Sequence, residues 1–294
     1  MARRRHEPFF AVIGGSTAYE FISSGAIKGE RIGRIDTPFG ASQPAFRVEA
    51  GDCSYFFMSR HGEADFDISA PFVNYRANIY ALKDLGVRQI ISWSAAGALK
   101  ETSETGRFFV LDDCIDFTKN RETTFFRFKG LGFIRQNEPF CPTMRAATMG
   151  ALQELGIPFN DRGTYICTEG PRMETPAEVR MFAALGGDLV GMTLCPEMFL
   201  ARELEMCYAS IAYVTNCAEG IRQRDYRPGR LYEGLSTRRE QKTVARSFKL
   251  LPQVIARLGE LLPNITPSCH CQQAMRYYQG RSGVGRDWRE WLNP

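Results

Sequence analysis

Short apolar runs and helical patterns alternate along most of this chain. The runs at 9–13, 55–59 and 89–94 are continuous, as in strands buried on both faces, and each leads into small or polar residues. The segments 77–86 and 144–155 have helical patterns instead, and a glycine stands at the end of each. This alternation predicts one α/β domain with a central mixed β-sheet flanked by helices.

The chain changes in character after residue 262. A helix over 240–262 is expected to close the domain, so that 1–262 forms the main domain and 263–294 a C-terminal extension. Charged residues around Pro228-Gly229 predict a mobile loop over 223–239 near the functional site. The aromatic residues of the extension are suited to packing on a neighbouring subunit; they are Tyr277, Tyr278, Trp288 and Trp291.

Hydrogen-bond donors stand where the three apolar runs end. The first run ends in Gly14-Gly15-Ser16-Thr17, the second in Arg60-His61-Gly62, and the third in the small residues 95–98. Small residues let backbone N–H groups approach an anion, and arginine offers a planar fork for phosphate. Because ligands of open α/β sheets collect at the carboxyl ends of strands, we expect one anion-binding site there.

Ordinary structural roles compete with this interpretation. A strand followed by two glycines is a common corner, and an arginine beside a histidine is often a solvated surface pair. The glycines are not a dinucleotide fingerprint, because the third glycine and the helical continuation are missing. They also lack the Gly-Lys-Ser/Thr ending of a P-loop. The residues alone leave these alternatives open.

Several motifs, in one order over roughly residues 9–260, resemble the methylthioadenosine phosphorylase branch of the trimeric purine nucleoside phosphorylases. Motifs that match together are far more specific than any single one. They are Gly14-Gly15-Ser16, Asp36-Thr37-Pro38-Phe39-Gly40, Ser59-Arg60-His61-Gly62, Val73-Asn74-Tyr75-Arg76-Ala77-Asn78, Thr168-Glu169-Gly170-Pro171-Arg172, Gly191-Met192-Thr193 and Cys195-Pro196-Glu197. The resemblance implies the nucleoside phosphorylase fold, cleavage of a nucleoside by inorganic phosphate, and a homotrimer or a hexamer built from two trimers.

The resemblance also assigns roles to single residues. Phosphate would be bound by the backbone amide of Ala95 and by the side chains of Ser16, Arg60, His61, Ser94 and Thr193. Met192 would lie beneath the ribose, and Met173 would also belong to the residues that bind base and ribose. Phe133 falls where a neighbouring subunit of these enzymes closes the 5′ end of the ribose pocket.

The base pocket departs from the methylthioadenosine phosphorylases. They carry aspartates after the strand that corresponds to 211–214, where this chain has Asn216 and Ala218, and Glu174 replaces their small hydroxyl residue. A carboxylate accepts hydrogen bonds, whereas an amide both donates and accepts, so the pair suits a base with N1–H, N7 and O6. This is the pattern of phosphorylases that accept inosine and guanosine, and of methylthioinosine phosphorylases.

Three of these residues also have plain structural interpretations. Glu174 stands at the start of a predicted helix, where a carboxylate stabilises the helix dipole. Met192 is also consistent with an ordinary core methionine. For Arg172 an ion pair with Glu197 or Glu178 is the favoured interpretation.

The implied mechanism needs no metal or other cofactor, because phosphate is itself the nucleophile and co-substrate. Asn216 is predicted to bind N7 and O6 of the base as negative charge develops there. Arg60 and His61, with His61 offering a further donor, are predicted to hold phosphate beside C1′. Asn216 and His61 are therefore the predicted catalytic residues.

Composition is consistent with this function and excludes others. The chain has 294 residues and a net charge of +4 without a basic cluster outside its ends, so nucleic-acid binding is not expected. Apolar runs long enough for a membrane span or a signal peptide are missing, which predicts a cytoplasmic enzyme. A non-catalytic nucleoside-binding protein would not use a phosphate site, and a nucleoside hydrolase would carry acidic groups in its place. The 5′ group, hydroxyl or methylthio, is left open, since 220–235 match neither branch.

Nine cysteines are an odd and fairly high number for such a chain. Most lie in apolar strands and are expected to be small buried hydrophobes. Cys269-His270-Cys271 stands in a polar segment, but the residues nearby in the chain offer no fourth ligand, so zinc is not expected. A redox or disulfide role and free thiols both stay open for this pair.

Overall fold

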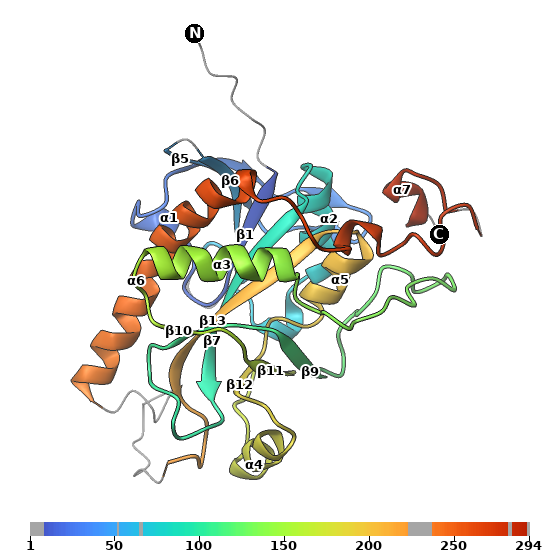
Figure 1. Cartoon of the computed structure of the whole chain (residues 1–294). Coiled ribbons are helices and arrows are strands. Elements are labelled where there is room, and N and C mark those ends of the chain that lie inside the picture. The colour runs from blue at the N-terminus through green and yellow to red at the C-terminus, as the bar shows by residue number, and fades with distance from the viewer. Residues whose placement is uncertain (1–8, 52, 65–66, 223–236, 282–283, 293–294) are drawn as a thin grey trace.

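An eleven-stranded mixed sheet forms the centre of the computed structural model, which describes residues 9–51, 53–64, 67–222, 237–281 and 284–292 (Figure 1). Its main path runs in the order β10-β8-β13-β7-β1-β6-β5-β2, with β9, β11 and β12 joined beside β7. Four neighbouring strands of this path, β13, β7, β1 and β6, are parallel. Their carboxyl ends therefore meet at one edge, as expected for a ligand site.

The strands have the following bounds: β1 Phe10–Gly14, β2 Gly29–Gly33, β5 Ala45–Ala50, β6 Cys53–Ser59, β7 Gln89–Ala98, β8 Phe108–Val110, β9 Asp113–Phe117, β10 Phe159–Asn160, β11 Thr164–Thr168, β12 Leu189–Gly191 and β13 Cys207–Cys217, with a separate hairpin of β3 Asp36–Thr37 and β4 Gly40–Ala41. The predicted central mixed sheet flanked by helices is confirmed.

Helices cover both faces of the sheet. They are α1 Tyr19–Ser23, α2 Tyr75–Asp84, α3 Pro142–Glu154, α4 Pro176–Ala184, α5 Glu197–Glu203, α6 Arg238–Leu261 and α7 Trp288–Trp291, with short 3-10 turns at Ala70–Phe72, Leu262–Asn264 and Cys271–Gln273. In Figure 1, α3 and α6 cross in front of the strands, and the two helices pack on each other.

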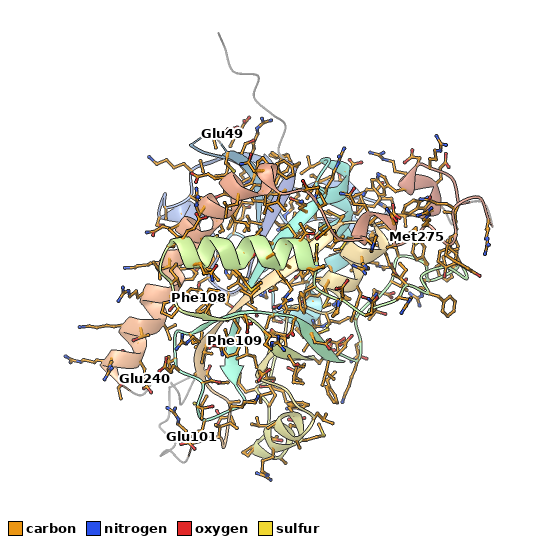
Figure 2. All side chains as sticks on the ribbon, in the orientation of Figure 1. Glu49, Glu101, Phe108, Phe109, Glu240 and Met275 are labelled. Atoms are coloured by element: carbon orange, nitrogen blue, oxygen red, sulfur yellow. The ribbon has the colours of Figure 1, made fainter. Side chains whose placement is uncertain are left out.

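Strand β1 shows how the sheet separates two cores. Phe10 and Val12 face a cluster that includes residues of α1, α3 and α6, whereas Ala11 and Ile13 face a second cluster with α2 and α5. Successive side chains of a strand point to opposite faces, so a continuous apolar run serves both cores. Phe108 and Phe109, labelled in Figure 2, divide between the same two clusters.

Two strands run further than their sequences suggested. The small residues 95–98 were expected to end a strand, but β7 continues through Ala98 and pairs with both β13 and β12. A Cβ on Gly97 would lie 3.3 Å from Val190, so the small side chain permits this close pairing. Asn216, expected after its strand, lies inside β13, just beyond a register shift that follows Val214. Such an irregularity re-aims the side chains that follow it.

The C-terminal extension packs on its own chain. Tyr278 and Trp291 are buried with Met275 and Phe126, and the ring of Trp288 lies 4.9 Å from that of Tyr80. The expected packing of these aromatics on a neighbouring subunit is therefore wrong for the two buried rings. Tyr277 remains 69 % exposed.

The helix expected over 240–262 is confirmed as α6. It begins two residues earlier, because Thr237 and Glu240 form a capping box at its N-terminus. Of the predicted mobile loop, 223–236 lie outside the described residues. Within the described part of the chain, the helices are too short or too polar to cross a membrane.

Candidate active site

The end of β1 lies directly against Arg60. A Cβ on Gly15 would stand 2.8 Å from the carbonyl oxygen of Trp93 and 3.3 Å from Nη1 of Arg60. Glycine is therefore required for this approach of backbone to guanidinium. The next residue, Ser16, is exposed, and Thr17 holds a positive φ of 61°. The predicted phosphate residues Ser16 and Arg60 thus come from two neighbouring parallel strands.

Arg60 is completely buried and paired with a carboxylate. Its Nε and Nη2 donate to Glu197 at 2.9 and 2.6 Å, and Nη1 donates to the Trp93 carbonyl at 3.2 Å. Burial alone would lower the pKa of Arg60, but the charge and hydrogen bonds of Glu197 outweigh it and raise that pKa. Glu197 therefore belongs to Arg60, while Arg172 pairs with Glu178 at 2.7 Å.

His61 presents an acceptor to the site. Its Nδ1 lies 2.9 Å from the carbonyl oxygen of Ile68, so this nitrogen carries the proton. Burial and the adjacent Arg60 charge lower the pKa of His61 to about 4, so the ring is neutral at pH 7. Nε2 is buried without a partner among the described residues. His61 was expected to offer a donor here; its neutral ring instead offers the lone pair of Nε2.

Three hydroxyl groups meet between β7, β11 and the residues that follow β12. Ser94 Oγ lies 3.2 Å from Thr193 Oγ1 and 3.0 Å from the hydroxyl of Tyr165. All three side chains are buried, and burial raises the pKa of Tyr165, which keeps its proton. The sequence indicated Ser94 and Thr193 but not Tyr165, whose hydroxyl occupies the space a side chain on Gly191 would fill.

Arg121 holds together the backbone segments that contain Thr168 and Met192. It donates through Nη1 to the carbonyls of Met192 and Cys195 at 2.7 and 2.6 Å, and through Nη2 to those of Thr168 and Glu169 at 3.1 and 2.7 Å. Sequence reasoning missed it, because no motif surrounds it. Met192 packs against Gly170, where an added Cβ would collide with its sulfur.

The two predicted base-reading residues are both buried. Glu174 is 6 % and Asn216 3 % exposed. Oε1 of Glu174 accepts a hydrogen bond of 2.6 Å from Thr168, at the carboxyl end of β11. Glu174 precedes the helix N-cap, Thr175, and Glu178 is the carboxylate that caps the helix. Glu174 therefore does not cap the helix, and its interaction with the helix dipole stays a prediction.

The amide of Asn216 is held by its chain neighbours. Thr215 Oγ1 lies 2.7 Å from Oδ1, and Nδ2 donates to the carbonyl of Cys217 at 2.8 Å. These contacts fix which end of the amide is the acceptor. They leave the second N–H of Nδ2 for another acceptor.

A short stretch of backbone links the two ends of the site. Thr168 Oγ1 lies 3.3 Å from the carbonyl oxygen of Gly191 and next to Glu174, while Thr193, two residues on, contacts Ser94. The groups predicted to bind base and phosphate are thus joined through 191–193, with Met192 between them. Ala95 and Met173 are half-buried beside these residues in the chain.

Phe133 is not part of this group within the chain. It is 85 % exposed, and its backbone N–H donates to the Tyr278 hydroxyl at 2.9 Å in the C-terminal extension. Its predicted role in a neighbouring subunit stays a prediction.

Comparison with known proteins shows the family of this chain. The model of the phosphorylase superfamily matches residues 11–255, most of the chain. This chain belongs to the phosphorylase superfamily. It shares 41 % identity over 255 residues with the 6-oxopurine nucleoside phosphorylase of Pyrococcus furiosus, covering 84 % of this chain and 94 % of the relative. A probable S-methyl-5′-thioinosine phosphorylase of Methanothermobacter thermautotrophicus is 40 % identical over 90 % of this chain and 88 % of its own length.

Solved phosphorylases share the fold. An adenosine/methylthioadenosine phosphorylase mutant of Schistosoma mansoni, crystallised with adenine, superposes with a TM-score of 0.79 at 28 % identity, covering 91 % of this chain and 96 % of that one. A methylthioadenosine phosphorylase from an antarctic soil metagenomic library gives the same score at 30 % identity, covering 91 % and 90 % of the two chains. The protein is a nucleoside phosphorylase and hence a pentosyltransferase.

Proposed function

We propose that this phosphorylase cleaves 6-oxopurine nucleosides, inosine and guanosine, with inorganic phosphate to give the free base and ribose 1-phosphate. The observation that carries the proposal is the burial of Glu174 and Asn216 near the carboxyl ends of β11 and β13. Thr168 engages one oxygen of Glu174, and one N–H of Asn216 is left for a ligand, so a purine with a keto group supplies the partners that remain.

The chemistry of Glu174 favours a keto purine. Thr168 is its hydrogen-bond partner within the described part of the chain, and it engages Oε1 alone. In inosine and guanosine, N1 carries a hydrogen that this acceptor needs, whereas N1 of adenosine is a second acceptor. An unmet buried polar group costs about 1–3 kcal/mol, which sets the scale of the discrimination.

Asn216 is the proposed catalytic residue at the base. As the glycosidic bond lengthens, negative charge develops on the purine, and the free N–H of Asn216 donates to it. The amide stands already oriented by Thr215 and Cys217, so it does not have to reorganise during the reaction.

The phosphate end supplies charge and positioning. We assign phosphate to the surroundings of Gly15, Ser16, Arg60 and the hydroxyl pair Ser94 and Thr193. His61 Nε2, with its lone pair, accepts the remaining proton of hydrogen phosphate. Phosphate so held beside C1′ attacks without a covalent enzyme intermediate or a further cofactor.

A methylthio substrate is the second candidate. The relative named as a probable S-methyl-5′-thioinosine phosphorylase favours it, and the base would be read by the same Glu174 and Asn216. The choice depends on what surrounds the 5′ carbon. Phe133 of a neighbouring subunit in a homotrimer, or in a hexamer of two trimers, is the proposed apolar cover there. Localisation in the cytoplasm is proposed as well, in keeping with nine free cysteines.

Turnover of four nucleosides tests the proposal. Inosine, adenosine, methylthioinosine and methylthioadenosine are compared at equal concentration with and without phosphate. We expect turnover to need phosphate and to be faster for the two keto purines. Faster cleavage of the two adenine nucleosides would overturn the base assignment, and phosphate-independent cleavage would overturn the reaction.

A further inference from the structure

Four cysteine side chains meet at one point far from the substrate residues. The sulfurs of Cys141, Cys207, Cys269 and Cys271 all lie within 4.8 Å of one another. Three of these side chains are buried and the fourth, Cys269, is half-buried. They come from the N-cap of α3, the first residue of β13 and the C-terminal extension.

The arrangement has the size of a tetrahedral metal site. Zinc–thiolate bonds of about 2.3 Å place the four sulfurs roughly 3.8 Å apart along every edge of the tetrahedron. Here Cys207 and Cys269 stand 3.5 Å apart, and the other pairs fall within the same limit of 4.8 Å. All four are free cysteines, and four sulfurs that all lie within 4.8 Å of one another are compatible with one shared centre.

A cation lies beside the sulfurs, where it would stabilise a negatively charged cluster. Arg202 Nη1 donates to Cys271 Sγ at 3.0 Å, and Nε of the same guanidinium is buried without a partner among the described residues. Among the residues that the structure describes, no carboxylate is paired with Arg202. A zinc ion with four thiolates carries a net charge of −2, which this guanidinium partly offsets, whereas two disulfides would be neutral and would give it no anionic partner.

We propose that Cys141, Cys207, Cys269 and Cys271 bind one structural zinc ion. Each thiol loses its proton on binding, and the thiolate sulfur donates an electron pair to the metal, so no oxidant or reductant takes part. With four protein ligands the site is closed, as in structural rather than catalytic zinc centres.

The position of the cysteine cluster in the fold indicates a structural role. Cys207 begins β13 and Asn216 stands nine residues later, so the cluster lies about 30 Å along the strand from the base-reading amide. Around the cluster, Ser268 N–H donates to Thr143 at 3.1 Å, and Met275 N–H donates to Glu205 at 2.9 Å. Met275 marks this part of the extension in Figure 2. Zinc would fasten the extension to α3, α5 and β13.

Metal analysis of the full-length protein, purified without chelators, tests the proposal. We expect about one zinc per chain, nine titratable thiols after denaturation, and a mass without disulfides. In the double variant Cys269→Ser/Cys271→Ser the zinc content should fall at least about tenfold. The matched control is Cys53→Ser, a buried cysteine outside the cluster, which should keep its zinc.

If the double variant does not fold, replacement of zinc by cobalt tests whether the four cysteines bind a metal ion. Protein produced with Co²⁺ should show the sulfur-to-cobalt charge-transfer bands and the intense visible absorption of a tetrahedral thiolate site. Removal of zinc should lower the Tm by several degrees while kcat for inosine at low temperature stays unchanged. Protein with nine free thiols and no metal, or with disulfides among these cysteines, would overturn the proposal, as would a cobalt spectrum without thiolate bands.

Discussion

The hydroxyl of Thr168 donates to Oε1 of Glu174 at 2.6 Å, and both side chains are buried. This bond fixes one carboxylate oxygen and orients the other. A hydroxyl has a single proton, so the bond to Glu174 leaves the carbonyl of Gly191, 3.3 Å away, as the weaker alternative. The specificity of the base pocket depends on this orientation.

Glu174→Gln should reverse the preference between bases. The amide donates where the carboxylate accepted, so N1–H of inosine meets a donor and N1 of adenosine gains a partner. We expect kcat/KM for inosine to fall by about 10- to 100-fold and the ratio of adenosine to inosine turnover to rise. Glu178→Gln, in the helix cap, is the control, with lower stability and unchanged preference. An unchanged ratio in Glu174→Gln would contradict the assignment.

Asn216→Ala should affect the chemical step more than binding. Loss of a donor that acts on developing charge typically lowers kcat by about 100- to 1000-fold. KM for inosine should change far less, and the Tm should move little because the Thr215 hydroxyl, once Oδ1 is gone, donates to the Ala96 carbonyl 3.2 Å away. Steady-state kinetics with inosine and saturating phosphate measure both values. A rise in KM at constant kcat would assign Asn216 to ground-state binding instead.

His61 should make the free enzyme less stable in acid. Its pKa is lowered to about 4 in the fold, against about 6.5 when unfolded, so between these values the unfolded chain binds more protons. The free energy of unfolding should therefore rise with pH across this window, by on the order of 3 kcal/mol, and be level above it. Thermal unfolding from pH 4 to 7 measures the effect in the wild type and in His61→Asn. An equal pH dependence in the variant would show that other groups cause it.

Glu197→Gln should be strongly destabilising. It leaves the buried Arg60 guanidinium without a counter-charge, and breaking a buried pair costs about 3–5 kcal/mol. Glu63→Gln, which breaks the solvent-exposed pair with Arg31, is the matched control and should have a much smaller effect. Denaturant unfolding gives both free energies. Equal losses in the two variants would mean that the buried pair adds no stability beyond that of a surface pair.

Much of the fold could be predicted from the chain because its patterns are local. The apolar run before Gly14 predicted β1, and helical patterns before Gly86 and Gly156 predicted α2 and α3 within about two residues of their bounds. The predicted ends of two strands were wrong, at 95–98 and at Asn216. There, pairing with neighbouring strands carried β7 and β13 beyond the point at which local preference suggested a stop.

In the site, too, residues within local motifs could be predicted, and residues placed only by the fold could not. Gly15, Arg60, Ser94 and Thr193 stand in motifs, and the structure brings them together. Arg121 and Tyr165 have no motif around them and act through carbonyls and hydroxyls that only the folded chain places within reach.

By itself the sequence determined the family, the sheet with its flanking helices, and the residue types that suit a keto purine, because these depend on local spacing. Only the tertiary structure decided that Arg60 pairs with Glu197, that His61 offers a lone pair, and that four cysteines from three distant segments share one point. Burial and the meeting of distant segments set these relationships, and neither can be read from the order of residues alone.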